Sequence, residues 1–128
     1  MVHLGLVTIV VDDYDAAIGF FVDTLGFELR EDRDEGRKRW VVVGSPAGGS
    51  DLLLAEASDE RQRARIGDQT GGRVGFFLHT EDFADTHGRL VAAGIRFEEE
   101  PRHEAYGTVA VFVDPWGNRW DLLQRAAT

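Results

Sequence analysis

The stretch LGLVTIVVDDYDAAIGFFVDTLGFELR, residues 4–30, sets the order in which the first structural elements follow one another. Leu6 to Val11 is an unbroken run of β-branched and apolar residues, which predicts a buried strand. Asp12-Asp13 can cap a helix whose apolar residues recur at helical spacing, and Gly26 ends that helix. Phe27 to Arg30 then returns to a strand pattern. The stretch therefore predicts a strand, a helix and a second strand.

The second half of the chain repeats this order in residues 73–99, RVGFFLHTEDFADTHGRLVAAGIRFEE. Asp82 follows Asp13 by 69 residues, and Gly94 follows Gly26 by 68. Each half continues with two more predicted strands, at 39–43 and 51–55 in the first half and at 108–113 and 119–124 in the second.

These elements predict an α+β fold made of two βαβββ modules, residues 4–56 and 73–125, joined by a polar linker at 57–72. One such module cannot cover the open face of its own sheet. We therefore expect the two modules to form a single domain over residues 1–128.

Composition narrows the chemistry and the partners. A chain of 128 residues that is 43% hydrophobic can bury a core, but it is short for two independent domains. With no cysteine, only His, Asp and Glu remain as strong metal ligands or bases. The net charge of −9 argues against binding to nucleic acid. No run approaches the roughly 20 apolar residues that cross a bilayer, and no basic leader is present, so we expect a cytoplasmic protein with no membrane partner.

Two helix ends and one late turn stand in register within the two halves. The first helix ends in Leu25-Gly26-Phe27 and the second in Ala93-Gly94-Ile95. A turn, Asp114-Pro115-Trp116-Gly117-Asn118, joins the last two strands. With these motifs the chain resembles the vicinal oxygen chelate superfamily, which includes glyoxalases, bleomycin-resistance proteins and dioxygenases. The resemblance extends from about Leu4 to Gln124 and implies this superfamily's fold.

The resemblance also implies where a metal would be held in the metal-dependent members. The first-strand ligand positions fall on Leu6 and Gly75, and the last-strand positions fall within 52–54 and on Asp121. Because only Asp121 carries a suitable donor, we expect no cofactor. A rearranged divalent-metal site is the alternative, and its candidates are Asp121, His79 and Glu56.

The missing ligands and the pair Tyr106-Gly107 resemble the metal-free, bleomycin-resistance branch, in which a cleft holds an antibiotic. An aromatic residue on a strand of the first half, here Trp40, is also similar. Strand alternation turns Phe77, His79, Val109, Val111 and Asp121 toward the cleft and Phe76, Leu78, Phe112 and Trp120 toward the helices. The predicted ligand-binding residues are Trp40, Leu54, Phe77, His79, His103, Tyr106, Val111 and Asp121.

Three functions follow as hypotheses. The leading one is a metal-free binding protein that sequesters a bulky aromatic antibiotic or natural product, bleomycin-like or enediyne-like, and so gives drug resistance. The second is a metal-dependent lyase, isomerase or dioxygenase of the glyoxalase type with an atypical ligand set. The third is an interaction or regulatory domain with a filled cleft. The resemblance further implies a homodimer whose clefts are shared between chains.

Overall fold

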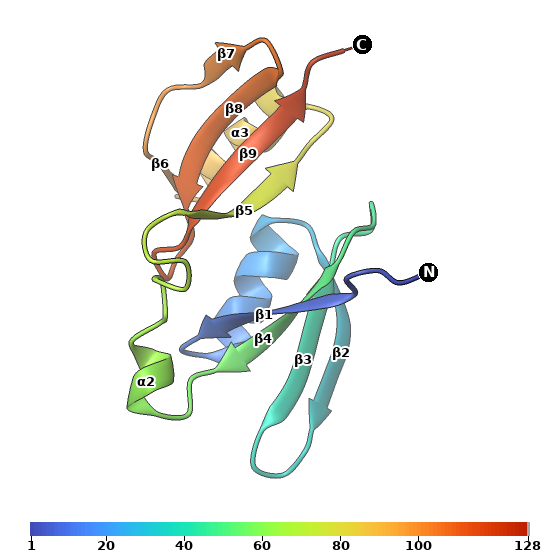
Figure 1. Cartoon of the computed structure of the whole chain (residues 1–128), viewed down its shortest axis with the longest axis vertical. Helices are drawn as coiled ribbons and strands as arrows, with labels where there is room; N and C mark the ends of the chain where they lie inside the picture. The colour runs from blue at the N-terminus through green and yellow to red at the C-terminus, as the bar shows by residue number, and fades with distance from the viewer. Residues whose placement is uncertain (128) are drawn as a thin grey trace. The chain divides into compact units, whose positions relative to one another are not determined.

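The computed structural model describes residues 1–127 and divides into two compact units, Met1–Ile66 and a second that begins at Gly67. Each unit is built on its own sheet, and a helix runs across one side of that sheet (Figure 1). This arrangement confirms the predicted α+β class. Within residues 1–127, no helix has the length and apolar character required to span a membrane.

The first unit has a four-stranded sheet in the order β1-β4-β3-β2. Parallel pairing of β1 with β4 aligns Ile9 with Leu54, and Leu54 aligns with Val41 on β3. These three side chains are fully buried on the helix side, together with Phe21. The elements are β1 (Leu6–Val11), α1 (Tyr14–Ile18), the π-helix η1 (Gly19–Thr24), β2 (Glu28–Asp34), β3 (Arg39–Gly44), β4 (Asp51–Glu56) and α2 (Glu60–Arg63).

The second unit has the sheet order β5-β9-β8-β6, with β7 paired to the edge of β8. Its core is aromatic: the ring of Trp120 stacks on Phe76 at 4.5 Å and on Phe112 at 5.7 Å. Phe112 and Trp120 are buried, as strand alternation predicts. The elements are β5 (Val74–His79), α3 (Phe83–Ala92), β6 (Arg96–Phe97), β7 (Arg102–Glu104), β8 (Gly107–Val113) and β9 (Arg119–Arg125).

Strand boundaries differ from the sequence prediction where the chain is polar. Strand β2, predicted over Phe27 to Arg30, continues to Asp34, because Arg39 on β3 holds Asp32 across the strand pair at 2.9 Å. Strand β6 spans only Arg96–Phe97. Strand β7 was not predicted, and the 57–72 segment contains the short helix α2, which Asp59 caps.

The turn between β8 and β9 is organised by one buried carboxylate. Asp114 is 4% exposed. Its Oδ1 accepts hydrogen bonds from the backbone N–H groups of Trp116, Gly117 and Asn118 at 2.9 to 3.0 Å. Its Oδ2 accepts from the Asn118 side-chain amide at 2.9 Å and from the Trp120 indole N–H at 3.0 Å. Asp114 therefore ties the turn to the aromatic core.

We expect Asp114→Asn to lower the free energy of unfolding by about 2–4 kcal/mol, because an amide NH₂ would replace one of two oxygens that both face N–H donors. Urea denaturation measures the change. Asp23→Asn is the matched control at an exposed carboxylate, and its effect should stay within about 0.5 kcal/mol. Equal effects of the two substitutions would contradict this role of Asp114.

Candidate functional site

The face of the second unit's sheet turned away from α3 carries an apolar surface with one carboxylate. Strand register places Asp121 on β9 between Phe77 on β5 and Val111 on β8. Phe77 is 60% exposed, which is unusual for a large apolar ring, whereas Val111 is 7% exposed. We call this side of the sheet, which carries Phe77, His79, Val109, Val111, Asp121 and Leu123, the open face. Val109 and Val111 are buried on it.

Asp121 is the electrostatic exception on the open face. Its Oδ1 is buried and accepts no hydrogen bond from any of residues 1–127. Loss of hydration raises the pKa of Asp121 above the usual carboxyl value; Glu99 raises it further, and Arg102 and Arg119 partly oppose the shift. A buried acceptor without a donor costs the folded state free energy. Such a group is a candidate for ligand recognition.

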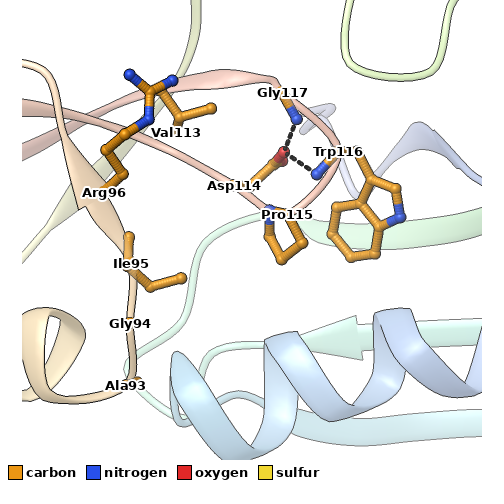
Figure 2. Close-up of a pocket in the computed structure, with 9 residues that line it drawn as sticks. All are labelled: Ala93, Gly94, Ile95, Arg96, Val113, Asp114, Pro115, Trp116 and Gly117. Carbon is orange, nitrogen blue, oxygen red and sulfur yellow. Dashed lines mark hydrogen bonds between the residues drawn. The ribbon is translucent and has the colours of Figure 1, made fainter.

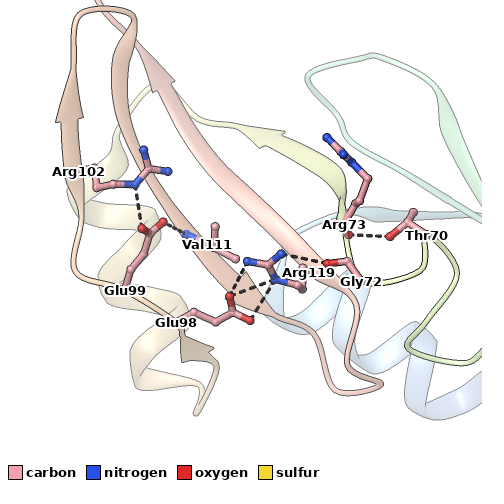
Figure 3. A network of polar contacts seen from close by, with 8 residues as sticks. All are labelled: Thr70, Gly72, Arg73, Glu98, Glu99, Arg102, Val111 and Arg119. Carbon is pink, nitrogen blue, oxygen red and sulfur yellow. Dashed lines mark hydrogen bonds and ion pairs between the residues drawn. The ribbon is translucent and has the colours of Figure 1, made fainter.

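Arg119, two residues before Asp121 on β9, is already held by other partners (Figure 3). Its Nη2 lies 2.8 Å from Glu98 Oε2, and its Nη1 donates to the carbonyl of Gly72 at 3.0 Å. The pKa of Arg119 is raised chiefly by Glu98. Its charge therefore acts on Asp121 only at a distance.

Glu99 and Arg102 fill the gap between β6 and β7 along the edge of β8 (Figure 3). Glu99 Oε2 accepts the backbone N–H of Val111 at 2.9 Å, which neither short strand satisfies. Its Oε1 accepts from Arg102 Nε at 2.8 Å, and Arg102 also contacts Glu104 at 3.1 Å. Arg102 is the main cause of the lowered pKa of Glu99. The side chains thus replace a missing strand partner.

Tyr106 stands at the rim of this surface, where β7 turns into β8. It is 55% exposed, and its carbonyl accepts the N–H of Ala126 at 2.9 Å. Gly107 follows with φ of +149°, and a methyl group there would run into the carbonyl of Gln124. The pKa of Arg102 is raised first by Glu99 and next by the Tyr106 hydroxyl, which places that hydroxyl against the guanidinium. The turn and Arg102 together fix the tyrosine.

The structure brings together half of the predicted ligand-binding residues. Phe77, His79, Val111 and Asp121 share the open face. His103 lies on the other side of the sheet, because it pairs with Thr108 and its Nδ1 is 3.3 Å from the Thr108 hydroxyl.

In the first unit, Leu54 is a fully buried residue of the helix-side core. Trp40 alternates to the opposite face, where its indole N–H donates to Glu31 at 3.2 Å. Glu56, at the end of β4, is exposed and shares the strand alternation of Leu54. Trp40 therefore lies on one side of the first sheet, and Leu54 and Glu56 lie on the other.

The residues at the expected metal positions do not match a divalent-ion site. Leu6 and Gly75 have no side-chain oxygen or nitrogen, and Asp121 supplies a single carboxylate. Among residues 1–127, no group of three or more His, Asp or Glu side chains is arranged to hold a metal ion. Divalent cations require several converging donors, which these positions lack.

A hollow of about 520 Å³ lies elsewhere in the second unit, between the end of α3 and the β8–β9 turn (Figure 2). Its polar carboxylate, Asp114, already accepts five hydrogen bonds from the turn and from Trp120. The hollow is lined by Ala93, Gly94, Ile95, Arg96, Val113, Asp114, Pro115, Trp116 and Gly117. With its carboxylate satisfied internally, this hollow is a weaker candidate than the open face.

The charged residues around Asp121 carry no motif in the sequence. Glu99 and Arg102 lie in a polar segment with no strand periodicity, so nothing indicated that they meet β8. Arg119 lies two residues before Asp121 on a predicted strand, and this spacing indicated that the two side chains share one face of the sheet.

Comparisons with known proteins agree with this fold. The family model of the Glyoxalase/Bleomycin resistance protein/Dioxygenase superfamily matches residues 3–122. An uncharacterized protein of Shewanella frigidimarina (strain NCIMB 400) is 51% identical over 127 residues, covering 97% of this chain and 92% of the relative. The uncharacterized protein YurT of Bacillus subtilis (strain 168) is 32% identical, covering 92% of this chain and 95% of YurT.

Solved structures give the same result. UcmS2 is 34% identical with a TM-score of 0.83, over 96% of this chain and 98% of that one. TnmS3, an antibiotic binding protein from Streptomyces sp. CB03234, is 28% identical with a TM-score of 0.80, over 98% of both chains. On the family match and these relatives, the chain belongs to the glyoxalase, bleomycin resistance protein and dioxygenase superfamily.

Proposed function

We propose that this protein is a metal-free binding protein that sequesters a bulky aromatic antibiotic or natural product, of the bleomycin or enediyne kind, and thereby confers drug resistance. The observation that carries the proposal is the 60% exposed ring of Phe77 next to Asp121 on the open face. An exposed aromatic ring with a polar group at its side suits stacking against a flat conjugated ligand. The exposed ring of Tyr106 adds a second apolar contact.

The similarity to TnmS3 supports the proposal, since that structure is described as an antibiotic binding protein and matches over 98% of both chains. The side chains at the expected metal positions also support the proposal, because a single carboxylate is better suited to orienting a ligand than to holding an ion. Affinity would then come mainly from stacking and from removal of apolar surface from water.

The competing function is a metal-dependent lyase, isomerase or dioxygenase, and the observation in its favour is that His79 shares the open face with Asp121. Elemental analysis of the purified, unchelated protein separates the two. We expect no stoichiometric divalent ion. About one ion per chain would overturn the metal-free proposal and direct attention to Asp121, His79 and Glu56.

We also propose that the protein acts in the cytoplasm as a homodimer with clefts shared between chains. The ring of Phe77, 60% exposed, is available for contact with a second chain. Native mass spectrometry should give twice the mass of the 14.2 kDa chain. A monomer mass at working concentration would contradict this part of the proposal.

We expect Phe77→Ala and Tyr106→Ala each to weaken binding of a conjugated drug about tenfold or more, because each removes an aromatic face. Tryptophan fluorescence, titrated with bleomycin and with an enediyne, measures affinity. Val91→Ala is the matched control, since Val91 is a 51% exposed apolar residue of α3 on the other side of the sheet. Loss of binding in the control, or none in the two variants, would count against the open face.

We expect Asp121→Leu to raise the free energy of unfolding at neutral pH, by up to about 1 kcal/mol, because it removes a buried acceptor without a partner. The pKa of Asp121 is raised in the folded state, so the folded protein holds this proton more tightly than the unfolded chain does. Wild-type stability contributed by this group is therefore lost as pH rises through the folded pKa.

Urea denaturation at a series of pH values tests this sign. The advantage of Asp121→Leu should be largest at neutral pH and should shrink as pH falls toward the ordinary aspartate pKa of about 3.9. A variant that is less stable than wild type at neutral pH would show that the carboxylate has a partner in the folded protein.

A further inference from the structure

Asp121 indicates which chemical group the ligand must carry. We propose, on the basis of the aromatic-binding function above, that the ligand bears an O–H or N–H donor beside its flat ring system and hydrogen-bonds through it to the half-buried carboxylate of Asp121. The donor would complete a hydrogen bond that the protein leaves open. The substrate class is thus narrowed from any conjugated aromatic compound to one with a donor at the ring edge.

The open acceptor lies next to the aromatic surface. Strand register pairs Asp121 with Phe77 on one side and with Val111 on the other. Neighbouring strands of a sheet lie roughly 4.7–4.9 Å apart, so the two side chains stand next to each other on β5 and β9. A ring that stacks on Phe77 therefore brings its edge substituents within hydrogen-bond reach of the Asp121 carboxylate.

The two arginines near Asp121 are bonded to other groups. Arg119 is bonded to Glu98 and to the Gly72 carbonyl, and Arg102 is bonded to Glu99 and Glu104. Figure 3 shows Arg119 with Glu98 and Gly72, and Arg102 with Glu99. Neither guanidinium donates a hydrogen bond to Asp121 Oδ1.

The charge balance around Asp121 favours a donor over an acceptor on the ligand. Two arginines stand against four carboxylates in this cluster, which comprises Arg102, Arg119, Glu98, Glu99, Glu104 and Asp121. A ligand carbonyl or anion would meet an excess of negative charge. A hydroxyl or amine would meet the group it can bond.

The test uses two fluorescent probes that differ by one donor, 1-hydroxypyrene and 1-methoxypyrene. Wild-type protein should bind 1-hydroxypyrene between about fivefold and a hundredfold more tightly, which is the range for satisfying one buried acceptor. Asp121→Leu should abolish this preference. Asp85→Leu, at an exposed carboxylate on the outer side of α3, is the matched control and should retain it.

The outcomes separate this inference from the function on which it rests. Equal binding of the two probes by wild type would overturn the inference that the ligand donates a hydrogen bond to Asp121, and it would leave aromatic binding intact. Tighter binding of 1-methoxypyrene would show that Asp121 acts as a protonated donor, and this also overturns the inference. No binding of either probe would overturn the proposed function, and the inference with it.

Discussion

In both units of the chain, helix covers just one side of the sheet. The other side therefore stays available for contacts with other groups. In the second unit, the rings of Phe76, Phe112 and Trp120 fill the side facing α3 and form a continuous stack. The alternate residues, including Phe77 and Asp121, therefore occupy the opposite face. Asp114 keeps this division in place, because its carboxylate joins the β8–β9 turn to the indole of Trp120.

The period of two along a strand explains what the sequence could predict. Apolar runs located β1 at its observed bounds, and alternation placed Trp120 in the core and Phe77 and Asp121 together on the other face. In the first unit, alternation assigns a residue to the core only once it is known which face of the sheet packs against the helix. Leu54, predicted at the ligand surface, lies in the core because it aligns with Ile9.

Contacts between a polar loop and a strand have no such period, and these were not predicted. Strand β7 has three exposed polar residues, so no apolar signal marks it. Glu99 lies beside β8 and accepts the N–H of Val111, which would otherwise lack a partner between β6 and β7. His103 turned out to face Thr108 for a related reason, since only the pairing of β7 with β8 decides its side.

On the function proposed here, Asp121 would serve ligand recognition without a metal. A divalent ion needs several donors, whereas a neutral or cationic ligand needs one well-placed acceptor in apolar surroundings. The ion pairs of Arg102 and Arg119 remove the nearby cations from competition while their charge limits the rise in the pKa of Asp121. The carboxylate is thus left without a donor from the described residues at Oδ1, at a cost to folding that is consistent with its burial and its raised pKa.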